Sequence, residues 1–342
     1  MKRWWHRYLR LPHELRDLGI IGLNHRNASL VLPLNPRRLY DRVDNKITTK
    51  KLAAARGIAI PETYGVVRTP SDVRRIGQII GNHDSFVIKP TRGSGGKGVL
   101  VICQRENDLY LKGSGVALNI TDIKYHLQNI IAGLFSLGGK RDTALIEARV
   151  DSSSVVTNLS YQGAPDIRIV ILHGYPLMAM LRASTKQSDG RSNLHQGALG
   201  IGIDIATGVT TQAIRHGRPI THHPDLKTPL IGVELPNWHD TLKMAVTCHE
   251  MCGLGYLGVD LMLDASHQPI MIEINARPGL AIQLANGRGI YPRAEKIRAR
   301  QRAFPDDSLD EKLAFSQKNF ASPNPMILSS DHGHDRNPQP AS

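Results

Sequence analysis

Three residues with oxygen-bearing side chains, Asp260, Glu273 and Asn275, are set within two apolar segments of the chain. The segments GVDLML and PIMIEINARPG are typical of strands, and the polar residues DASHQ between them favour a hairpin. Side chains two positions apart on a strand share a face, and strand pairing would bring Asp260 beside the other two. Hard oxygen ligands without His or Cys suit Mg²⁺, so we predict a magnesium site. The alternative is a solvated cluster of polar side chains on a sheet face.

A glycine-rich loop is the second candidate for chemistry. Lys89 lies near the end of the apolar segment FVIKP, and the loop TRGSGGKG separates it from the apolar segment VLVIC. Glycines let backbone N–H groups close over phosphate oxygens, while a neighbouring lysine neutralises their charge. The loop matches neither the GxxxxGK[ST] pattern nor a GxGxxG that opens a helix. By itself, such a loop is more often a flexible hairpin turn than a phosphate site.

The elements that must position these residues follow an irregular order. Apolar spacing predicts a helix over residues 44–57 and another over residues 238–252. TALIEARV and DIRIVILHGYPLMAMLRAS are typical of further strands, and the second of these segments should turn at His173 and Gly174. Strands and helices do not alternate regularly, so we predict an α+β protein with a largely antiparallel sheet rather than a doubly wound one.

Composition and charge narrow the class of protein. The chain has 342 residues, 41% of them hydrophobic, and three cysteines, which favours a sizeable core and a reducing, cytoplasmic setting. A net charge of +13 attracts anions, but 5% aromatic residues and no recognition motif argue against a nucleic-acid binder. No apolar stretch is long enough to span a membrane. The basic, aromatic start MKRWWHRYLRLP could make peripheral membrane contact or dock onto the protein itself.

Five segments in the same order resemble the ATP-grasp superfamily, and within it the RimK-type alpha-L-glutamate ligases and their bacterial homologues. They are DNKITTKKLAAARGIAIPETY, FVIKPTRGSGGKGV, DIRIVIL, RSNLHQGA and GVDLMLDASHQPIMIEINARPGL. The resemblance implies an ATP-grasp fold, in which two α+β lobes enclose the nucleotide. Residues 44–150 would form the small lobe, with the glycine-rich loop and the helix before it, and residues 151–300 the large lobe with the metal site. Residues 1–43 would be a truncated N-terminal region, and residues 318–342 a disordered tail.

The resemblance also implies roles for individual residues. The nucleotide phosphates would contact Lys46 and Lys89, beneath a loop containing Gly93, Ser94, Gly95, Gly96 and Gly98. Adenine would bind the hinge residues Glu147, Ala148 and Val150, and the ribose Asp166, while Arg191, Ser192 and Asn193 would contact the nucleotide. Asp260, Glu273 and Asn275 would hold two Mg²⁺ ions, for which Mn²⁺ could substitute. The candidate catalytic residues are Arg182, Asn193 and Arg277, although the two arginines could merely pair with carboxylates. Arg168 is as suited to a structural salt bridge as to substrate.

These parts imply an ATP- and Mg²⁺-dependent carboxylate–amine ligase that works through an acyl phosphate, with amino acids or peptides as substrates and glutamate as one candidate. Only about 43 residues precede the first predicted helix, too few for the α/β domain that usually completes the substrate pocket. The N-terminal segment, a second copy of the chain or a partner protein would have to complete it. A non-catalytic ATP-binding module with a basic docking surface is the alternative.

Overall fold

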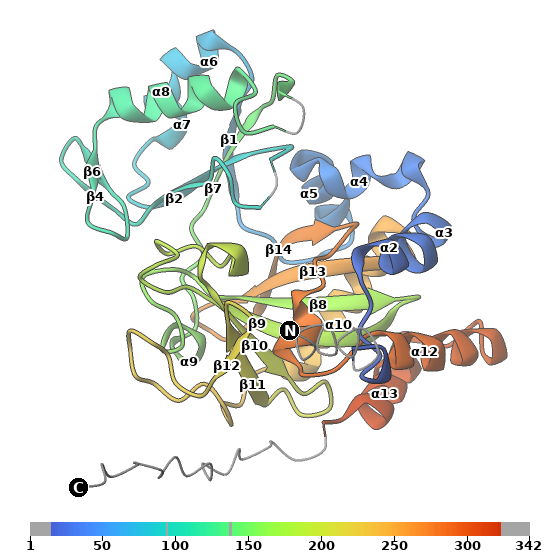
Figure 1. The fold of residues 1–342 in the computed structure, drawn as a ribbon. Coiled ribbons are helices and arrows are strands. Elements are labelled where there is room, and N and C mark those ends of the chain that lie inside the picture. The colour runs from blue at the N-terminus through green and yellow to red at the C-terminus, as the bar shows by residue number, and fades with distance from the viewer. Residues whose placement is uncertain (1–14, 94, 137–138, 323–342) are drawn as a thin grey trace, which may run out of the picture.

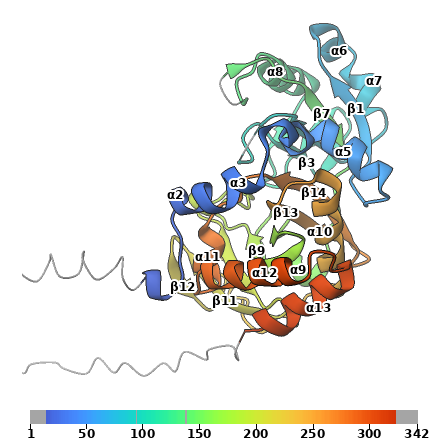
Figure 2. The ribbon, with the colours of Figure 1, turned by 90° about the vertical axis from the view of Figure 1, so that its right-hand side faces the viewer.

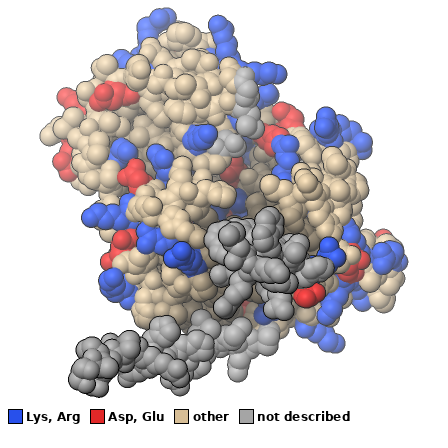
Figure 3. Space-filling model, viewed as in Figure 1, with Lys and Arg blue, Asp and Glu red and all other residues tan. Residues whose placement is uncertain are grey.

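The computed structural model describes residues 15–93, 95–136 and 139–322, which form a small upper lobe and a larger lower lobe (Figure 1). Each lobe is built on an antiparallel sheet with helices packed against it. The predicted α+β class and the antiparallel sheet are therefore confirmed. On the face seen in Figure 3, Lys and Arg side chains lie over both lobes and are interspersed with acidic ones.

The small lobe contains a four-stranded sheet in the order β1-β7-β2-β3. Helix α8 covers it with Ile123, Leu127 and Ile130, spaced at one helical turn and fully buried. The strands of this sheet are β1 (Thr63–Val67), β2 (Phe86–Pro90), β3 (Leu100–Ile102) and β7 (Ala144–Glu147). The helices are α6 (Pro70–Arg74), α7 (Ile76–Ile80) and α8 (Ile120–Ile131), and a three-stranded sheet contains β4 (Gln104–Glu106), β5 (Leu109–Leu111) and β6 (Ala117–Leu118).

The large lobe contains a seven-stranded sheet in the order β12-β11-β10-β9-β8-β13-β14. Its strands are β8 (Asp166–Leu172), β9 (Tyr175–Ala183), β10 (Leu199–Ile203), β11 (Thr210–Arg215), β12 (Arg218–Ile220), β13 (Tyr256–Leu263) and β14 (Pro269–Asn275). The helices are α9 (Ser154–Thr157), α10 (Trp238–Cys252), α11 (Ala281–Ala285), α12 (Tyr291–Ala303) and α13 (Leu309–Phe320), and a 3-10 turn covers Leu194–Gln196. The predicted turn at His173 and Gly174 is present, and both residues have positive φ, as a tight hairpin requires.

The helix predicted over residues 44–57 is divided in two. Helix α4 (Asp41–Asp44) ends at Asn45, whose extended backbone (φ −116°, ψ 104°) starts a new helix, α5 (Lys46–Ala55). The Asn45 side chain accepts a hydrogen bond from the Ile47 N–H at 3.1 Å, which caps α5. The grouping of this helix with the small lobe is wrong, because Ala53 of α5 is buried in the core of the large lobe.

The segment before α4 also belongs to the large lobe. Its short helical turns are α2 (Leu23–Arg26), a π-helical turn (Asn27–Val31), α3 (Leu32–Leu34) and a 3-10 turn (Arg37–Leu39). Ile21, Leu30, Val31 and Val43 are buried in the large-lobe core, so the described part of residues 1–43 is not a separate unit. Figure 2 shows α2 and α3 lying above α11 and α12.

The C-terminal part of the described chain is helical for longer than expected. The prediction that a disordered tail begins at residue 318 is wrong, because α13 continues to Phe320, whose side chain is buried beside Arg293. Residues 323–342 lie outside the described residues, as do Trp4, Trp5 and the expected membrane contact of the N-terminus. Within the described residues, no helix has both the length and the apolar character needed to cross a membrane.

Candidate functional site

The hairpin of β13 and β14 brings the three predicted metal ligands together. Asp260 pairs with Glu273 across the two strands, and Gly258 pairs with Asn275. The Asn275 amide donates a hydrogen bond to Asp260 Oδ2 at 3.1 Å. The predicted juxtaposition of Asp260, Glu273 and Asn275 is therefore present, while their role as metal ligands stays a prediction.

Two arginines from neighbouring strands surround Asp260, whose side chain is only 3% exposed. Arg168 Nε and Nη2 donate to the two oxygens of Asp260 at 2.7 and 2.6 Å, and Arg182 Nη2 donates at 2.9 Å. Burial disfavours the charged carboxylate, but the two guanidinium groups outweigh burial and hold the pKa of Asp260 below its ordinary value. Asp260 is therefore ionised at neutral pH. The sequence allowed Arg168 either a structural salt bridge or a substrate contact, and the structure shows the salt bridge, with Asp260.

Asp166 lies in the same ion-pair network as Asp260. Arg182 Nη2 donates to Asp166 Oδ2 at 2.8 Å, and Arg182 Nε donates to the other oxygen. Asp166 and Asp260 therefore hold one guanidinium between them and fix the direction of Arg182. The ribose contact expected of Asp166 stays a prediction.

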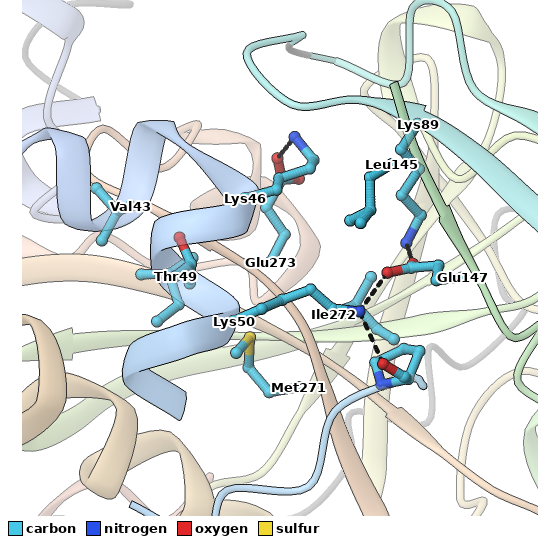
Figure 4. A pocket seen from close by; sticks show the side chains of 12 residues that line it. Val43, Lys46, Thr49, Lys50, Lys89, Leu145, Glu147, Met271, Ile272 and Glu273 are labelled. Carbon is cyan, nitrogen blue, oxygen red and sulfur yellow. Dashed lines mark hydrogen bonds and ion pairs between the residues drawn. The ribbon is translucent and has the colours of Figure 1, made fainter. Parts of the chain in front are cut away.

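Lysines and carboxylates meet across the cleft between the lobes (Figure 4). Lys46 Nζ lies 3.0 Å from Glu273 Oε1 and donates to the Gly93 carbonyl at 3.2 Å. Glu147 is paired with both Lys89 and Lys50, the latter at 2.6 Å. Burial disfavours the charged form of Glu147, but these two lysines hold its pKa below the ordinary value. Three lysines thus line the pocket between the lobes together with Glu147 and with Glu273 of the β13–β14 hairpin.

Lys50 was not among the predicted site residues, although its spacing from Lys46 could have indicated it. Lys50 follows Lys46 by one helical turn on α5, so the two side chains share a face. The hinge residues have partners within the protein: the Glu147 carboxylate pairs with two lysines, and the Ala148 N–H donates to the Glu62 carbonyl at 2.8 Å. Their contact with adenine stays a prediction. Val150 lies in the irregular connection that leads from β7 into the large lobe.

The pocket between the lobes is narrow. It has a volume of about 10 Å³, and its polar lining consists of Lys46, Lys50, Lys89, Thr49, Glu147 and Glu273. Its apolar lining comes from α4, from the segment between α5 and β1, from β7 and from β14. The residues are Val43, Pro61, Leu145, Met271, Ile272 and Ile274. This volume is too small for a nucleotide in the present arrangement of the two lobes.

The glycine-rich loop adopts the left-handed backbone that glycine tolerates best. Gly95, Gly96 and Gly98 have φ values of 65°, 75° and 73°. His126 Nε2 is 3.0 Å from the Gly98 carbonyl, which ties the end of the loop to α8. Gly93 forms an isolated bridge with Ser136, and Ser94 lies outside the described residues.

The RSN triplet meets the loop through one side chain. The Asn193 amide donates to the Gly95 carbonyl at 3.4 Å, so the large lobe touches the loop directly. Ser192 Oγ instead donates to the Ala164 carbonyl at 3.1 Å, and Arg191 is exposed. Of the three residues, it is therefore Asn193 whose side chain contacts the glycine-rich loop.

A substitution at Gly98 tests whether the glycine-rich loop needs its present backbone conformation. A Cβ at this position would lie 2.5 Å from Phe135 Cγ, in addition to the strain of the positive φ. For Gly98→Ala we expect the affinity for ATP to fall about tenfold. The added methyl group would overlap Phe135, and the glycine-rich loop would have to move to relieve this overlap. Titration calorimetry with a non-hydrolysable ATP analogue measures this affinity.

Gly115→Ala is the matched control. Gly115 has φ 81° in a turn of the same lobe, but no atom lies within 4 Å of an added Cβ. Equal affinity losses in the two variants would contradict a role for the contact between the loop and Phe135. Recovery of affinity in Gly98→Ala with Phe135→Leu would support it.

The donor set of the hairpin fits a hard cation. Two carboxylates and one amide oxygen are ligands that Mg²⁺ accepts, with phosphate oxygens and waters supplying the remainder. Within the described residues no group of three or more His, Cys, Asp and Glu has metal-binding geometry. That result follows from the composition of this hairpin, whose third member is an asparagine.

Arg277 lies two residues beyond Asn275, past the end of β14. Its guanidinium is 5.0 Å from the centre of the Tyr40 ring, and Nη2 is 3.4 Å from Asp44 Oδ2. The side chain is 48% exposed. Arg277 therefore faces the N-terminal segment and solvent, unlike Arg182, which is held inside the hairpin network.

The two α+β lobes, the glycine-rich loop and the lysines opposite an acidic hairpin define an ATP-grasp protein. More narrowly, the chain belongs to the family described as sugar-transfer associated ATP-grasp, which matches residues 25–299. The predicted membership of the ATP-grasp superfamily is confirmed.

The chain also resembles curated bacterial proteins. It is 23% identical to the probable alpha-L-glutamate ligase 1 of Hahella chejuensis, over 76% of this chain and 64% of that protein. It is 24% identical to the probable alpha-L-glutamate ligase of Ectopseudomonas mendocina, with the same coverage. The chain thus spans less than two thirds of the length of these relatives.

Among solved structures, D-cycloserine synthetase DcsG matches with a TM-score of 0.46 and 16% identity, over 78% of this chain and 72% of that one. The D-alanine–D-alanine ligase from Bacillus anthracis complexed with ATP matches with a TM-score of 0.42 and 14% identity, over 79% and 69% of the two chains.

Proposed function

We propose that this protein is an ATP- and Mg²⁺-dependent ligase that joins a carboxylate to an amine through an acyl phosphate. The observation that carries the proposal is the hairpin of Asp260, Glu273 and Asn275, whose Glu273 pairs with Lys46 and lines the pocket between the lobes together with Lys46 and Lys89. Family membership and the names of the curated relatives support the same class of reaction.

The chain's own residues divide the work of the first step. Lys46, Lys50 and Lys89 bind phosphate oxygens and neutralise their charge once the carboxylates release them. Arg182, fixed by Asp166 and Asp260, offers a preorganised guanidinium beside the hairpin. Asp260, Glu273 and Asn275 would hold Mg²⁺, which supplies further charge neutralisation on the transferred group. The glycine-rich loop closes over the cleft and excludes water from the reactive intermediate.

The reaction balances without a covalent protein intermediate. A substrate carboxylate oxygen attacks the γ-phosphorus, the bond from the γ-phosphorus to the bridging oxygen breaks, and ADP leaves. An amine then attacks the acyl carbon of the acyl phosphate, loses a proton and expels inorganic phosphate. The products are an amide, ADP and phosphate.

The substrates we propose are an amino-acid or peptide carboxylate and an amine. Glutamate enters the set because the curated relatives carry glutamate ligase in their names. Amino sugars belong among the amines to test, because the family is described as sugar-transfer associated.

The test is a matrix of carboxylates and amines scored for ADP and phosphate release. We expect release above background only when both substrates are present with ATP and Mg²⁺, and an amide product of matching mass. Release of AMP and pyrophosphate would show that the carboxylate is activated by adenylation rather than as an acyl phosphate. ATP consumption that ignores both substrates would contradict a ligase.

A further inference from the structure

A second, wider hollow opens where the N-terminal segment meets the end of β14. Its volume is about 520 Å³, within the range of small-molecule pockets. Among the described residues, six line it: Asn27, Val31, Leu32, Arg37, Tyr40 and Arg277. Five of them come from the segment before α4, and the sixth lies two residues beyond Asn275. We call this hollow the N-terminal pocket.

The N-terminal segment is attached to the strands that carry the candidate metal ligands. Buried Asn35 donates to the Tyr256 carbonyl at 2.6 Å and the Ala276 carbonyl at 2.8 Å, and accepts from the Tyr256 N–H at 3.0 Å. Buried Arg26 donates to the Pro278 carbonyl at 2.9 Å. These contacts hold the start of β13 and the residues after β14, so the pocket has a fixed position relative to the hairpin.

The lining of the pocket is suited to an anion with a short apolar body. Arg37 and Arg277 supply two guanidinium groups, which bind carboxylates through paired hydrogen bonds. The Tyr40 ring orients Arg277, with Val31 and Leu32 adding apolar surface. Asp44 is the acidic group that pairs with Arg277, but at 3.4 Å with both side chains about half exposed the pair is weak. A ligand carboxylate can therefore displace it.

The N-terminal pocket adjoins the residues of the proposed phosphate site. Arg277 pairs with Asp44, which lies two residues before Lys46, and Lys46 Nζ lies 3.0 Å from Glu273 Oε1. A small molecule with one carboxylate at Arg277 therefore has its other end directed toward neighbouring residues of that site.

We propose that the N-terminal pocket binds the second anionic group of the carboxylate substrate, and that this substrate is a short dicarboxylate such as an acidic amino acid. Arg37 and Arg277 contact that group, while the other carboxylate is presented to the phosphate site. The proposal rests on the proposed ligase function for its chemical step, but the binding of the anion stands without it. The segment of residues 27–40 thereby supplies part of the proposed substrate pocket.

Calorimetry with glutarate as the probe tests binding alone, in the presence of a non-hydrolysable ATP analogue and Mg²⁺. We expect Arg37→Ala to weaken glutarate binding about ten- to a hundredfold, as loss of a charged hydrogen-bonding group does, with binding of the ATP analogue unchanged. Arg37→Lys should recover part of the affinity, because it keeps the charge but loses the paired geometry. Arg38→Ala is the matched control, an exposed neighbour that does not line the pocket.

Two further arms separate the ligand classes. Glutaramate, in which an amide replaces one carboxylate, should bind the wild type more weakly than glutarate does. Its affinity should be the same for the wild type and for Arg37→Ala. Inorganic phosphate should compete poorly; tighter binding of phosphate than of glutarate would overturn the choice of a dicarboxylate. Absence of glutarate binding to the wild type at millimolar concentration, or equal binding to Arg37→Ala, would overturn the pocket.

Turnover distinguishes this proposal from the ligase function. If a substrate is found, Arg37→Ala should raise KM for the dicarboxylate about ten- to a hundredfold with little change in KM for ATP. If glutarate binds as expected but no substrate pair releases ADP, the pocket stands and the ligase function fails. If ADP is released with a monocarboxylate as efficiently as with a dicarboxylate, the ligase function stands and the pocket assignment fails.

Discussion

Replacing Glu273 and Asn275 together by alanine should abolish Mg²⁺-dependent turnover of ATP, with a rate loss of at least about 1,000-fold. The double substitution removes two of the three oxygen donors of the hairpin and leaves Asp260, which is already bonded to two arginines. A steady-state assay of ADP release over a range of Mg²⁺ concentrations measures the loss.

Gln268→Ala provides the matched control for that experiment. Gln268 lies in the turn of the same hairpin, where its side chain contacts only the Ser266 carbonyl among the described residues, at 3.4 Å. We expect turnover of this variant to equal the wild type. ATP turnover that survives in the double variant, with unchanged Mg²⁺ dependence, would remove the metal assignment.

Arg182→Met should lower the free energy of unfolding at neutral pH by about 3–5 kcal/mol, the range measured when one partner of a buried ion pair is removed. The change leaves Asp166 without its guanidinium partner and Asp260 with the Arg168 guanidinium and the Asn275 amide. Chemical denaturation, followed by circular dichroism, measures the difference. The second variant, Asp166→Asn with Arg182→Met, should recover part of the loss, because it removes an uncompensated carboxylate.

The pH dependence of the loss tests its electrostatic origin. Arg168 and Arg182 hold the pKa of Asp260 below its unfolded value of about 3.9, so the stability gained is complete above that pH. It is lost as the pH falls through the folded pKa. The difference between wild type and Arg182→Met should therefore shrink below about pH 4. A difference that stays constant with pH would point to lost packing instead.

Local patterns were enough to predict the hairpin and two of the helices. The alternation around Asp260 and Glu273 and the short polar turn between them determine which side chains share a face, whatever surrounds the hairpin. The helix Trp238–Cys252 was predicted to the residue, because its apolar spacing and the glycine that follows it are both local signals.

Contacts between distant segments could not be predicted in the same way. The partner of Asp260 is Arg168, which lies 92 residues earlier in the chain, and only the sheet order makes them neighbours. The lysine partners of Glu147 were missed for the same reason, since they lie on α5 and β2. The segment before α4 consists of turns of three to five residues, too short for a periodic pattern to show.

Asn35 and Arg26 have a consequence for how the protein can be dissected. A fragment that starts at residue 44 would retain every candidate nucleotide contact, yet it would strip hydrogen-bond donors from the carbonyls of Tyr256, Ala276 and Pro278. It would also bare the apolar surface that Ile21, Leu30 and Val31 cover. The part of the chain from residue 44 onward therefore depends on the segment before it, and shortened versions should begin upstream of Ile21.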